Sequence, residues 1–287
     1  MHFSELPQQG DNETRHVLGL SGGKDSAALA IYLKDHYPAI SERVEYFFSD
    51  TGAELKEAYE FLDRLETWLG KEIVRLSTGR EFDHWLKVHN GMLPSARQRW
   101  CTRTMKIQPF ERFVGDDPVI TYVGIRADEQ REGYISTKPS IKAVFPFIED
   151  GIAKADVFRF LEETVGVPEY YKWRSRSGCY FCFFQRQDEW LGLKENHPEL
   201  FERAKRYEMS KRERYDLDVA GTSLVGSGNY TWSSEGTLDE LVVKAEKRRK
   251  ELGVIASTAD KNKRWQDLLL EQDEDDPEDQ ACLICSL

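Results

Sequence analysis

The sequence contains no hydrophobic run long enough to cross a membrane. A membrane helix needs roughly 18 consecutive apolar residues, and polar or charged residues interrupt every apolar stretch of this 287-residue chain. Residues 1–11 are polar and lack the apolar core of a signal peptide. We therefore expect a cytoplasmic protein without a membrane partner.

Net positive charge is lacking as well, because the formal charge at pH 7 is −11. The negative charge is distributed unevenly along the chain. Residues 271–287 carry seven acidic residues and no lysine or arginine, so the formal charge of residues 1–270 is −4. A body this mildly acidic does not exclude a nucleic-acid partner, since the local potential at a site matters more than the total. Whole-chain disorder is excluded by the 40% hydrophobic content.

Apolar runs and amphipathic segments alternate along the first part of the chain. Short apolar runs predict strands at 15–20, 44–49, 73–76 and 119–123. Helical spacing of apolar residues predicts helices at 25–36, 54–69, 81–89, 104–114 and 153–165. This alternation predicts an α/β fold with a doubly wound parallel sheet.

Charged helical patterns at 187–215 and 235–252 follow the alternating part. We therefore expect three regions. Residues 1–170 form a nucleotide-binding α/β domain, residues 171–270 a mainly helical region that contains cysteines, and residues 271–287 an acidic flexible tail.

The first predicted strand and helix are joined by the loop Ser21-Gly22-Gly23-Lys24-Asp25-Ser26. Backbone N–H groups at a helix N-terminus, together with a lysine and two hydroxyls, form a site for an anion such as a nucleotide polyphosphate. The loop is not a Walker A motif, because only three residues separate Gly19 from Gly23 and an acid follows Lys24.

The hexapeptide resembles the PP-loop of the ATP pyrophosphatase superfamily. This resemblance implies the HUP-like fold of adenine nucleotide alpha hydrolases, with ATP and Mg²⁺ bound. It also implies a reaction in which a substrate is adenylated and pyrophosphate is released. Three further stretches resemble phosphoadenylyl-sulfate (PAPS) reductase-like proteins: Phe48–Gly52, Gly124–Glu129, and Pro146–Phe158, in which Phe147 and Phe158 are departures.

The same resemblance supplies candidate site residues. The catalytic candidates are Lys24, Asp25, Asp50 and Arg126. The nucleotide-binding candidates are Ser21, Gly22, Gly23, Lys24, Asp25, Ser26, Asp50, Gly124, Arg126 and Arg131. An acid at a strand's carboxyl end suits Mg²⁺ or a ribose hydroxyl, and the arginines suit the charge on the α-phosphate or pyrophosphate. A structural salt bridge remains the alternative role for each arginine.

The five cysteines, an odd number in a chain of this size that is expected to be cytoplasmic, do not indicate a disulfide framework. They are Cys101, the pair Cys179 and Cys182, and the pair Cys282 and Cys285. A C-x-x-C pair can bind zinc, act as a redox couple or ligate an iron–sulfur cluster, and spacing alone does not choose.

The stretch Arg99–Pro109 resembles the R-x-C-T-x-x-L-K-x-x-P segment of DndC-like DNA phosphorothioation proteins. This resemblance implies that Cys101, Cys179 and Cys182 carry a 4Fe-4S cluster, with zinc as the alternative. The fourth ligand stays open between a tail cysteine, another residue and sulfide. Arginines and aromatic residues surround these cysteines in sequence, which suits either a phosphodiester or the stabilisation of an anionic cluster.

These resemblances predict an ATP pyrophosphatase that adenylates an acceptor for iron–sulfur-dependent sulfur transfer, in DNA phosphorothioate modification. The implied partners are a nucleic acid, DNA rather than tRNA, a cysteine desulfurase or other sulfur donor, and further subunits of a modification or defence system. The alternatives are an adenylyl-sulfate or PAPS reductase, a tRNA thiolase and a nucleotide-sensing subunit. The absence of the reductases' E-C-G-[IL]-H tail motif weighs against the first alternative.

Overall fold

The computed structural model describes residue 3 and residues 14–129, 138–208 and 230–251. At its centre lies a five-stranded, all-parallel sheet with the strand order β3-β2-β1-β4-β5. The strands are β1 (Arg15–Gly19), β2 (Val44–Ser49), β3 (Ile73–Leu76), β4 (Val119–Tyr122) and β5 (Ile141–Val144). Four of the five agree with the predicted strands to within one residue. The fifth, β5, is missing from the prediction because its four residues include a lysine and give no clear apolar run.

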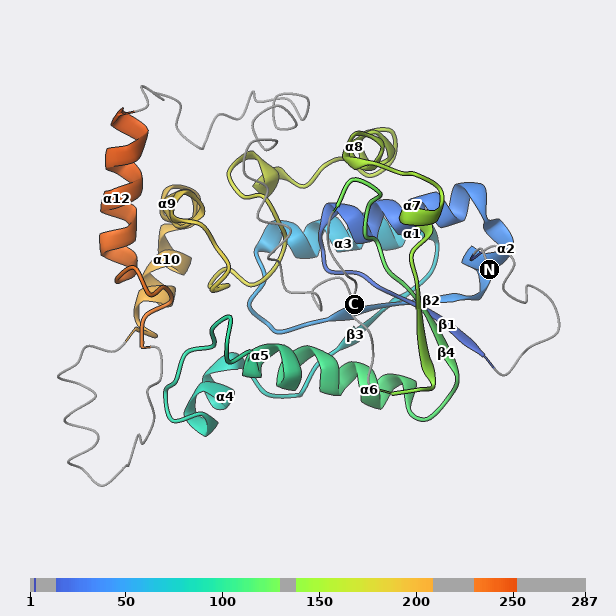
Figure 1. Ribbon diagram of the computed structural model, residues 1–287, viewed down its shortest axis with the longest axis horizontal. Helices are drawn as coiled ribbons and strands as arrows, with labels where there is room; N and C mark the ends of the chain where they lie inside the picture. The colour runs from blue at the N-terminus through green and yellow to red at the C-terminus, as the bar shows by residue number, and fades with distance from the viewer. Residues whose placement is uncertain (1–2, 4–13, 130–137, 209–229, 252–287) are drawn as a thin grey trace.

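Helices cover both faces of the sheet (Figure 1). On one face lie α1 (Lys24–His36), α2 (Pro38–Arg43), α3 (Lys56–Leu69), α7 (Pro146–Glu149) and α8 (Lys154–Glu162). On the other lie α4 (Phe82–Val88) and the helical run of α5 (Trp100–Thr102), the π-helical η2 (Arg103–Ile107) and α6 (Gln108–Val114). The prediction of a doubly wound α/β fold is therefore confirmed.

Separate apolar cores hold the two faces. The larger packs α1, α3 and α8 on the sheet and contains the fully buried Leu29, Phe61 and Leu161. On the opposite face, Phe47 of β2 stacks on Phe110 of α6, with ring centroids 5.0 Å apart. Both faces of the central strands are thus removed from water, as their continuous apolar sequences require.

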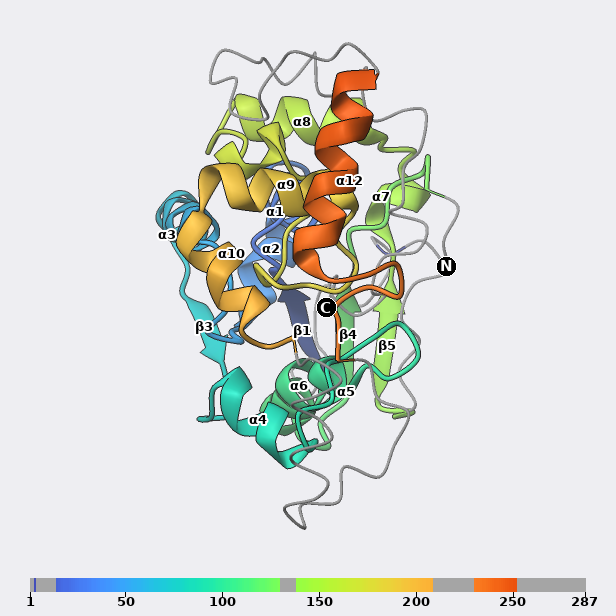
Figure 2. The ribbon, with the colours of Figure 1, turned by 90° about the vertical axis from the view of Figure 1, so that its left-hand side faces the viewer.

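A helical C-terminal region follows, as predicted. It begins with the 3₁₀ turn η3 (Glu169–Lys172) and continues with α9 (Gln187–Asn196), α10 (Pro198–Lys205) and α12 (Leu238–Glu251). In Figure 2, α9 lies between α10 and α12. An aromatic core joins this region to the α/β part, because Phe82 and Trp100 pack together with Phe181, Trp190 and Trp232.

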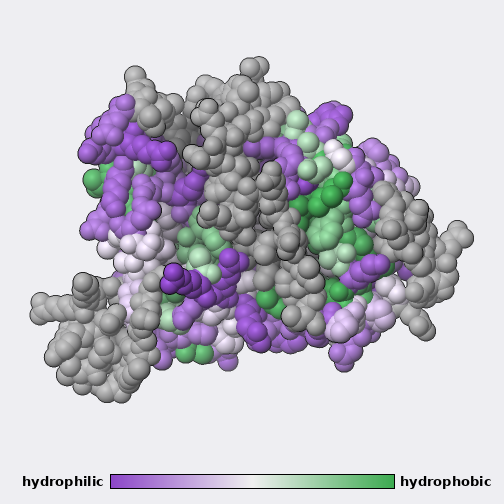
Figure 3. Space-filling view, in the orientation of Figure 1, coloured by the Kyte–Doolittle hydropathy of each residue, from purple (hydrophilic) through white to green (hydrophobic). Residues whose placement is uncertain are grey.

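Most of the visible surface is hydrophilic on the face shown in Figure 3, where apolar side chains gather over α7 and the edge strand β5. Ile148 of α7 is 46% exposed there. Within the described residues, no helix combines the length and apolar character needed to cross a bilayer.

The strand order places a topological switch point next to the loop of residues 21–26. The sheet grows outward from β1 in both directions, with β2 on one side and β4 on the other. In open α/β sheets, ligands bind at such a switch point, outside the carboxyl ends of the strands. Residues that follow β1, β2 and β4 therefore converge on one edge of the sheet.

Candidate functional site

The loop that follows β1 is folded around its own hydroxyl groups. The Ser26 Oγ accepts a hydrogen bond from the Ser21 N–H at 3.1 Å, and the Ser21 Oγ accepts one from the Gly23 N–H at 3.2 Å. Gly22 has φ +73°, a backbone conformation that favours glycine. A Cβ at Gly23 would lie 2.5 Å from the Ser177 Oγ, so both glycines are needed where they stand.

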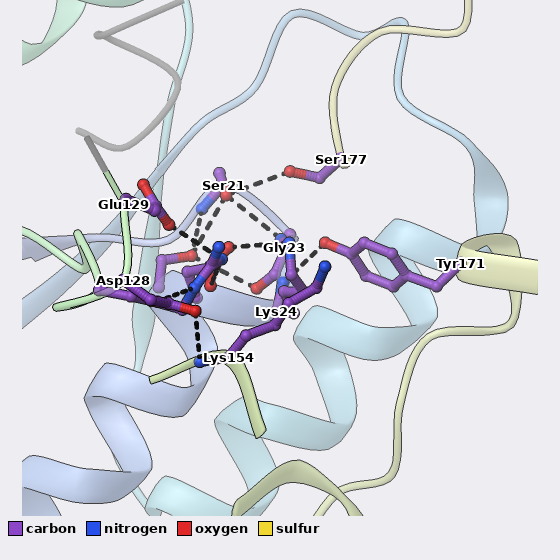
Figure 4. A network of polar contacts seen from close by, with 12 residues as sticks. Ser21, Gly23, Lys24, Asp128, Glu129, Lys154, Tyr171 and Ser177 are labelled. Atoms are coloured by element: carbon purple, nitrogen blue, oxygen red, sulfur yellow. Dashed lines mark hydrogen bonds and ion pairs between the residues drawn. The ribbon is translucent and has the colours of Figure 1, made fainter. Parts of the chain in front are cut away.

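Buried cations converge on one carboxylate beside this loop. Lys24 is 1% exposed and its Nζ lies 3.1 Å from Asp25 Oδ2, while Arg126 is 2% exposed and its Nη1 lies 2.8 Å from Asp25 Oδ1. Arg126 also pairs with Asp128 at 3.0 Å and Glu129 at 2.9 Å, and Figure 4 shows this network around the loop. A buried guanidinium needs such partners because its desolvation is costly.

Glycine at position 124 allows β4 and α1 to approach this closely. A Cβ there would lie 2.9 Å from the backbone oxygen of Asp25 and 3.1 Å from its carbonyl carbon. Because Arg126 follows two residues later, the close approach brings its guanidinium to Asp25. Gly124 therefore sets the distance between the two halves of the site.

The C-terminal region covers the loop with three hydroxyl groups. The Tyr171 Oη accepts a hydrogen bond from the Lys24 N–H at 2.9 Å, the Tyr170 hydroxyl donates to the Gly22 carbonyl oxygen at 2.5 Å, and the Ser177 hydroxyl donates to Ser21 at 3.2 Å. The sequence predicts unpaired N–H groups here. In the structure, the N–H groups of Gly23 and Lys24 donate hydrogen bonds to the hydroxyls of Ser21 and Tyr171. An anion at this helix N-terminus would therefore compete with Tyr171.

Asp50 lies at the carboxyl end of β2, as predicted. Its Oδ1 accepts hydrogen bonds from the Gly52 N–H and the Tyr59 hydroxyl, both at 2.8 Å. The Tyr59 hydroxyl also lies 3.3 Å from the Glu54 Oε2. Because a hydroxyl has one hydrogen, it donates to only one of the two carboxylates at a time.

Glu54 connects this edge of the sheet to the cysteines. Glu54 is 7% exposed, and its carboxylate accepts hydrogen bonds from the Thr51 hydroxyl at 2.9 Å and the Ala53 N–H at 3.2 Å. The Cys179 Sγ lies 3.6 Å from Glu54 Oε1 and 3.2 Å from the Thr51 Oγ1. The Asp50–Glu54 segment thus reaches the loop edge at one end and a cysteine at the other.

One cavity is lined by all three cysteines of the described residues. Cys101 comes from α5, while Cys179 and Cys182 come from the stretch before α9, and Lys106, Phe183 and Phe184 complete this part of the lining. The structure therefore brings Cys101 and the pair Cys179 and Cys182, which is distant from it in the sequence, to one cavity. Across the described ranges, no three His, Cys, Asp or Glu side chains lie close enough to bind a single metal ion.

Burial raises the pKa of the Cys179 thiol well above its usual value, and the neighbouring Glu54 carboxylate raises it further. Lys106 opposes both effects, as does the hydrogen bond to Thr51. The thiolate form therefore depends on the cation that lines the cavity and on any metal that replaces the proton.

The predicted residues fall into two adjacent groups. Ser21 to Ser26, Asp50, Gly124 and Arg126 meet at the carboxyl edge of the sheet, and the cysteines line the cavity. Arg131, Cys282 and Cys285 lie outside the described residues. The residues that sequence reasoning misses are Tyr170, Tyr171, Ser177, Glu54 and Tyr59. The first three lie about 150 residues from the loop that they contact, so spacing along the chain gives no signal for them.

Fold and site together define a doubly wound α/β protein whose glycine-rich loop at the switch point lies next to a cysteine-lined cavity. Residues 15–163, just over half of the chain, match the family model described as phosphoadenosine phosphosulfate reductase domain. The chain therefore belongs to this family.

Similar proteins include two from Methanocaldococcus jannaschii, the uncharacterized proteins MJ0066 and MJ0973. The first is 28% identical over 230 residues, 75% of this chain and 45% of the relative. The second is 27% identical over 209 residues, 69% of this chain and 48% of the relative. The chain therefore spans about half the length of these relatives.

Among solved structures, the crystal structure of phosphoadenylyl-sulfate (PAPS) reductase from Candida auris, a phosphate complex, is similar with a TM-score of 0.42 and 16% identity. The similarity covers 54% of this chain and 75% of that one.

Proposed function

We propose that the protein is an ATP pyrophosphatase that adenylates an acceptor, releases pyrophosphate and prepares the acceptor for iron–sulfur-dependent sulfur transfer, with the backbone of DNA as the acceptor. The observation that carries the proposal is the convergence of Lys24 and Arg126 at the switch point, beside a cavity lined by three cysteines. A PP-loop enzyme needs cationic groups around the α-phosphate, and sulfur chemistry needs thiolates within reach.

The loop residues bind and orient the triphosphate in this proposal. Incoming phosphate oxygens replace the Tyr171 hydroxyl on the Lys24 N–H and take over part of the cationic charge that Asp25 now neutralises. Positive charge held in a buried site stabilises developing negative charge more strongly than charge in water does. Asp50 Oδ1 already accepts two hydrogen bonds, so its other oxygen is suited to Mg²⁺ or a ribose hydroxyl.

For the cysteine cavity we propose a cluster rather than a single zinc ion. A single zinc ion draws its ligands into one tetrahedron at Zn–S distances of about 2.3 Å, and no three ligands of the described residues are that close. In a four-iron cluster each thiolate binds its own iron, so the ligands stand further apart. Cys101, Cys179 and Cys182 would hold such a cluster, which would supply an iron site for sulfide.

The test is pyrophosphate release from α-labelled ATP by anaerobically purified protein, with iron and acid-labile sulfide assayed in the same sample. AMP and pyrophosphate with bound iron are the expected result, and Lys24→Ala should abolish the release. Unchanged release by that variant would remove the loop from the mechanism. Cys179→Ser should remove any absorbance near 400 nm, roughly where iron–sulfur clusters absorb.

The second candidate function is the reduction of adenylyl sulfate or PAPS, and membership of the reductase family favours it. In that reaction the loop binds a nucleotide that is already formed, and a thiol attacks its sulfur. Thiol-dependent release of sulfite from adenylyl sulfate, without turnover of ATP, would support this candidate over the first. The nucleotide-sensing alternative predicts ATP binding with neither product.

A further inference from the structure

Two arginines from distant parts of the chain meet at the cysteine cavity. The Cζ atoms of Arg99 and Arg176 each lie 5.0 Å from the centroid of the Phe184 ring, which also lines the cavity. Arg103 lies about one helical turn beyond Arg99 and is exposed. We call Arg99, Arg103 and Arg176 the arginine rim.

No arginine of the rim forms a close ion pair with a described residue, although the charge of Arg176 acts on the buried Glu189 and lowers the pKa of that carboxyl. In the part of the chain that the structure describes, no Asp or Glu oxygen lies within 4.0 Å of a nitrogen of these three arginines. Other arginines do have such partners, namely Arg15, Arg75, Arg126, Arg159 and Arg249. Unpaired guanidinium groups gathered on a chain of charge −11 indicate a site for an anion.

Stabilisation of the thiolates is the competing role for these charges, and the geometry assigns it to a different residue. Lys106 lines the cavity together with the three cysteines, and it is the cation that lowers the pKa of Cys179. None of the arginines of the rim contributes to the cavity lining. Their charge is therefore available to a ligand at the mouth of the cavity.

We propose that the arginine rim binds the phosphates of a single-stranded nucleic-acid segment and holds one nucleotide over the cysteine cavity. The proposal rests on the proposed function, because it specifies the strand form of the acceptor. Arginine guanidinium planes and aromatic rings stack on bases only where these have left the duplex stack. Phe183 and Phe184, which are half-buried with ring centroids 4.4 Å apart, offer such a surface at the mouth.

The test is fluorescence anisotropy with a labelled single-stranded DNA of about 12 nucleotides, within the range of known single-strand sites. The same sequence as a duplex, the same sequence as RNA and a mononucleotide serve as competitors. Affinity is measured at salt concentrations from about 50 to 200 mM, because the slope of log K against log [salt] is about −0.7 per neutralised phosphate on a single strand.

The expected result is that the single strand binds more tightly than the duplex. The double variant Arg99→Ala/Arg176→Ala should flatten the salt slope by about 1.4, or about 0.7 for each arginine. Arg99→Lys should keep the slope and lose affinity, since it retains the charge but not the planar stacking group. Arg159→Ala, the control on α8, removes one positive charge at an arginine that has an acidic partner, and should leave both quantities unchanged.

Equal slopes for the wild-type protein and the double variant would overturn the proposal, provided that both melt at the same temperature. Tighter binding of the duplex, or displacement by the mononucleotide at equal nucleotide concentration, would also overturn it. Pyrophosphate release measured on the same wild-type sample separates the two proposals. Rim-dependent binding without pyrophosphate release contradicts only the proposed function, and release without rim-dependent binding contradicts only this inference.

Discussion

Replacing Gly124 by alanine tests whether the close approach of β4 and α1 builds the nucleotide site. The new Cβ would lie 2.9 Å from the Asp25 oxygen, 3.1 Å from the Asp25 carbon and 3.4 Å from the Ser26 nitrogen. All three are backbone atoms, so no side chain can rotate away. Relief of the clash requires the loop after β4 and the first turn of α1 to separate by roughly half an ångström, with a cost of about 1–3 kcal/mol for overpacking.

The separation acts directly on the charge network. Arg126 lies two residues after Gly124 and contacts Asp25 at 2.8 Å, so a shift of this size weakens the pair that positions both charges. We expect the affinity for ATP to fall about tenfold or more, equivalent to about 1.4 kcal/mol. Isothermal titration calorimetry with an ATP analogue that resists α–β cleavage measures this loss without turnover.

Gly70→Ala provides the control for general destabilisation. Gly70 ends α3 at φ +68° with no heavy atom within 4 Å of the added Cβ, so alanine there strains the backbone by about 1–2 kcal/mol and leaves the nucleotide site intact. Both variants should lose stability, while only Gly124→Ala should lose affinity. If Gly124→Ala bound the analogue as tightly as Gly70→Ala does, the proposed link between this glycine and the Arg126–Asp25 pair would be wrong.

Three further predictions concern other parts of the molecule. Thr51→Val should slow the alkylation of Cys179 in cluster-free protein at about pH 8, because the Thr51 hydrogen bond lowers the pKa of this thiol. Peptide mass spectrometry measures the rate, and the control Thr51→Ser should react like the wild type. A faster reaction of the valine variant would contradict the contact. Trp190→Ala should cost about 3–5 kcal/mol in denaturant unfolding because this side chain is 1% exposed in the aromatic core, and a loss below about 1 kcal/mol would place Trp190 outside that core. His197→Asn should show a pH-dependent loss of stability. Glu57, 2.9 Å away, raises the pKa of His197 from 6.5, so the pair stabilises the fold below pH 6.5 and the contribution disappears as the pH rises through the raised pKa. A stability difference between wild type and variant that stays constant from about pH 5.5 to 8.5 would refute this pair.

Much of the α/β architecture is predictable from local patterns, because the long helices carry helical periodicity and four of the five strands are short apolar runs. The strands β2 and β3 agree with the predicted bounds exactly as residues 44–49 and 73–76. The short elements α2, α7 and β5 are missing from the prediction, since each mixes apolar residues with proline or charged residues and so gives neither a helical period nor a continuous apolar run. Their conformation depends on contacts with residues that are distant in the sequence.

The candidate site is predictable wherever its residues follow a strand. Lys24, Asp50 and Arg126 each stand just beyond β1, β2 and β4, and the carboxyl ends of parallel strands share one edge. The hydroxyls of Tyr170, Tyr171 and Ser177 reach the loop from the C-terminal region, in contacts that the sequence does not encode by spacing. What the sequence shows as an open anion site is therefore a covered one in the structure.

The Asp50–Glu54 segment connects the loop edge of the site to the cysteine cavity. Asp50 is fixed by the Gly52 N–H, while Thr51 and Glu54 hold Cys179 in the neighbouring cavity. The Ala53 carbonyl oxygen accepts a hydrogen bond from the Tyr180 N–H at 2.8 Å, which ties the same segment to the backbone beside that cysteine. Movement of the edge of β2 would therefore move the cysteine as well. Tyr59 has one hydroxyl hydrogen and can donate it to either Asp50 or Glu54. If a cation binds Asp50, the Tyr59 hydroxyl donates to Glu54 instead and stabilises the negative charge of Glu54 beside Cys179. On this reasoning, the occupancy of the nucleotide edge and the electrostatics of the cysteine cavity are coupled through a five-residue segment.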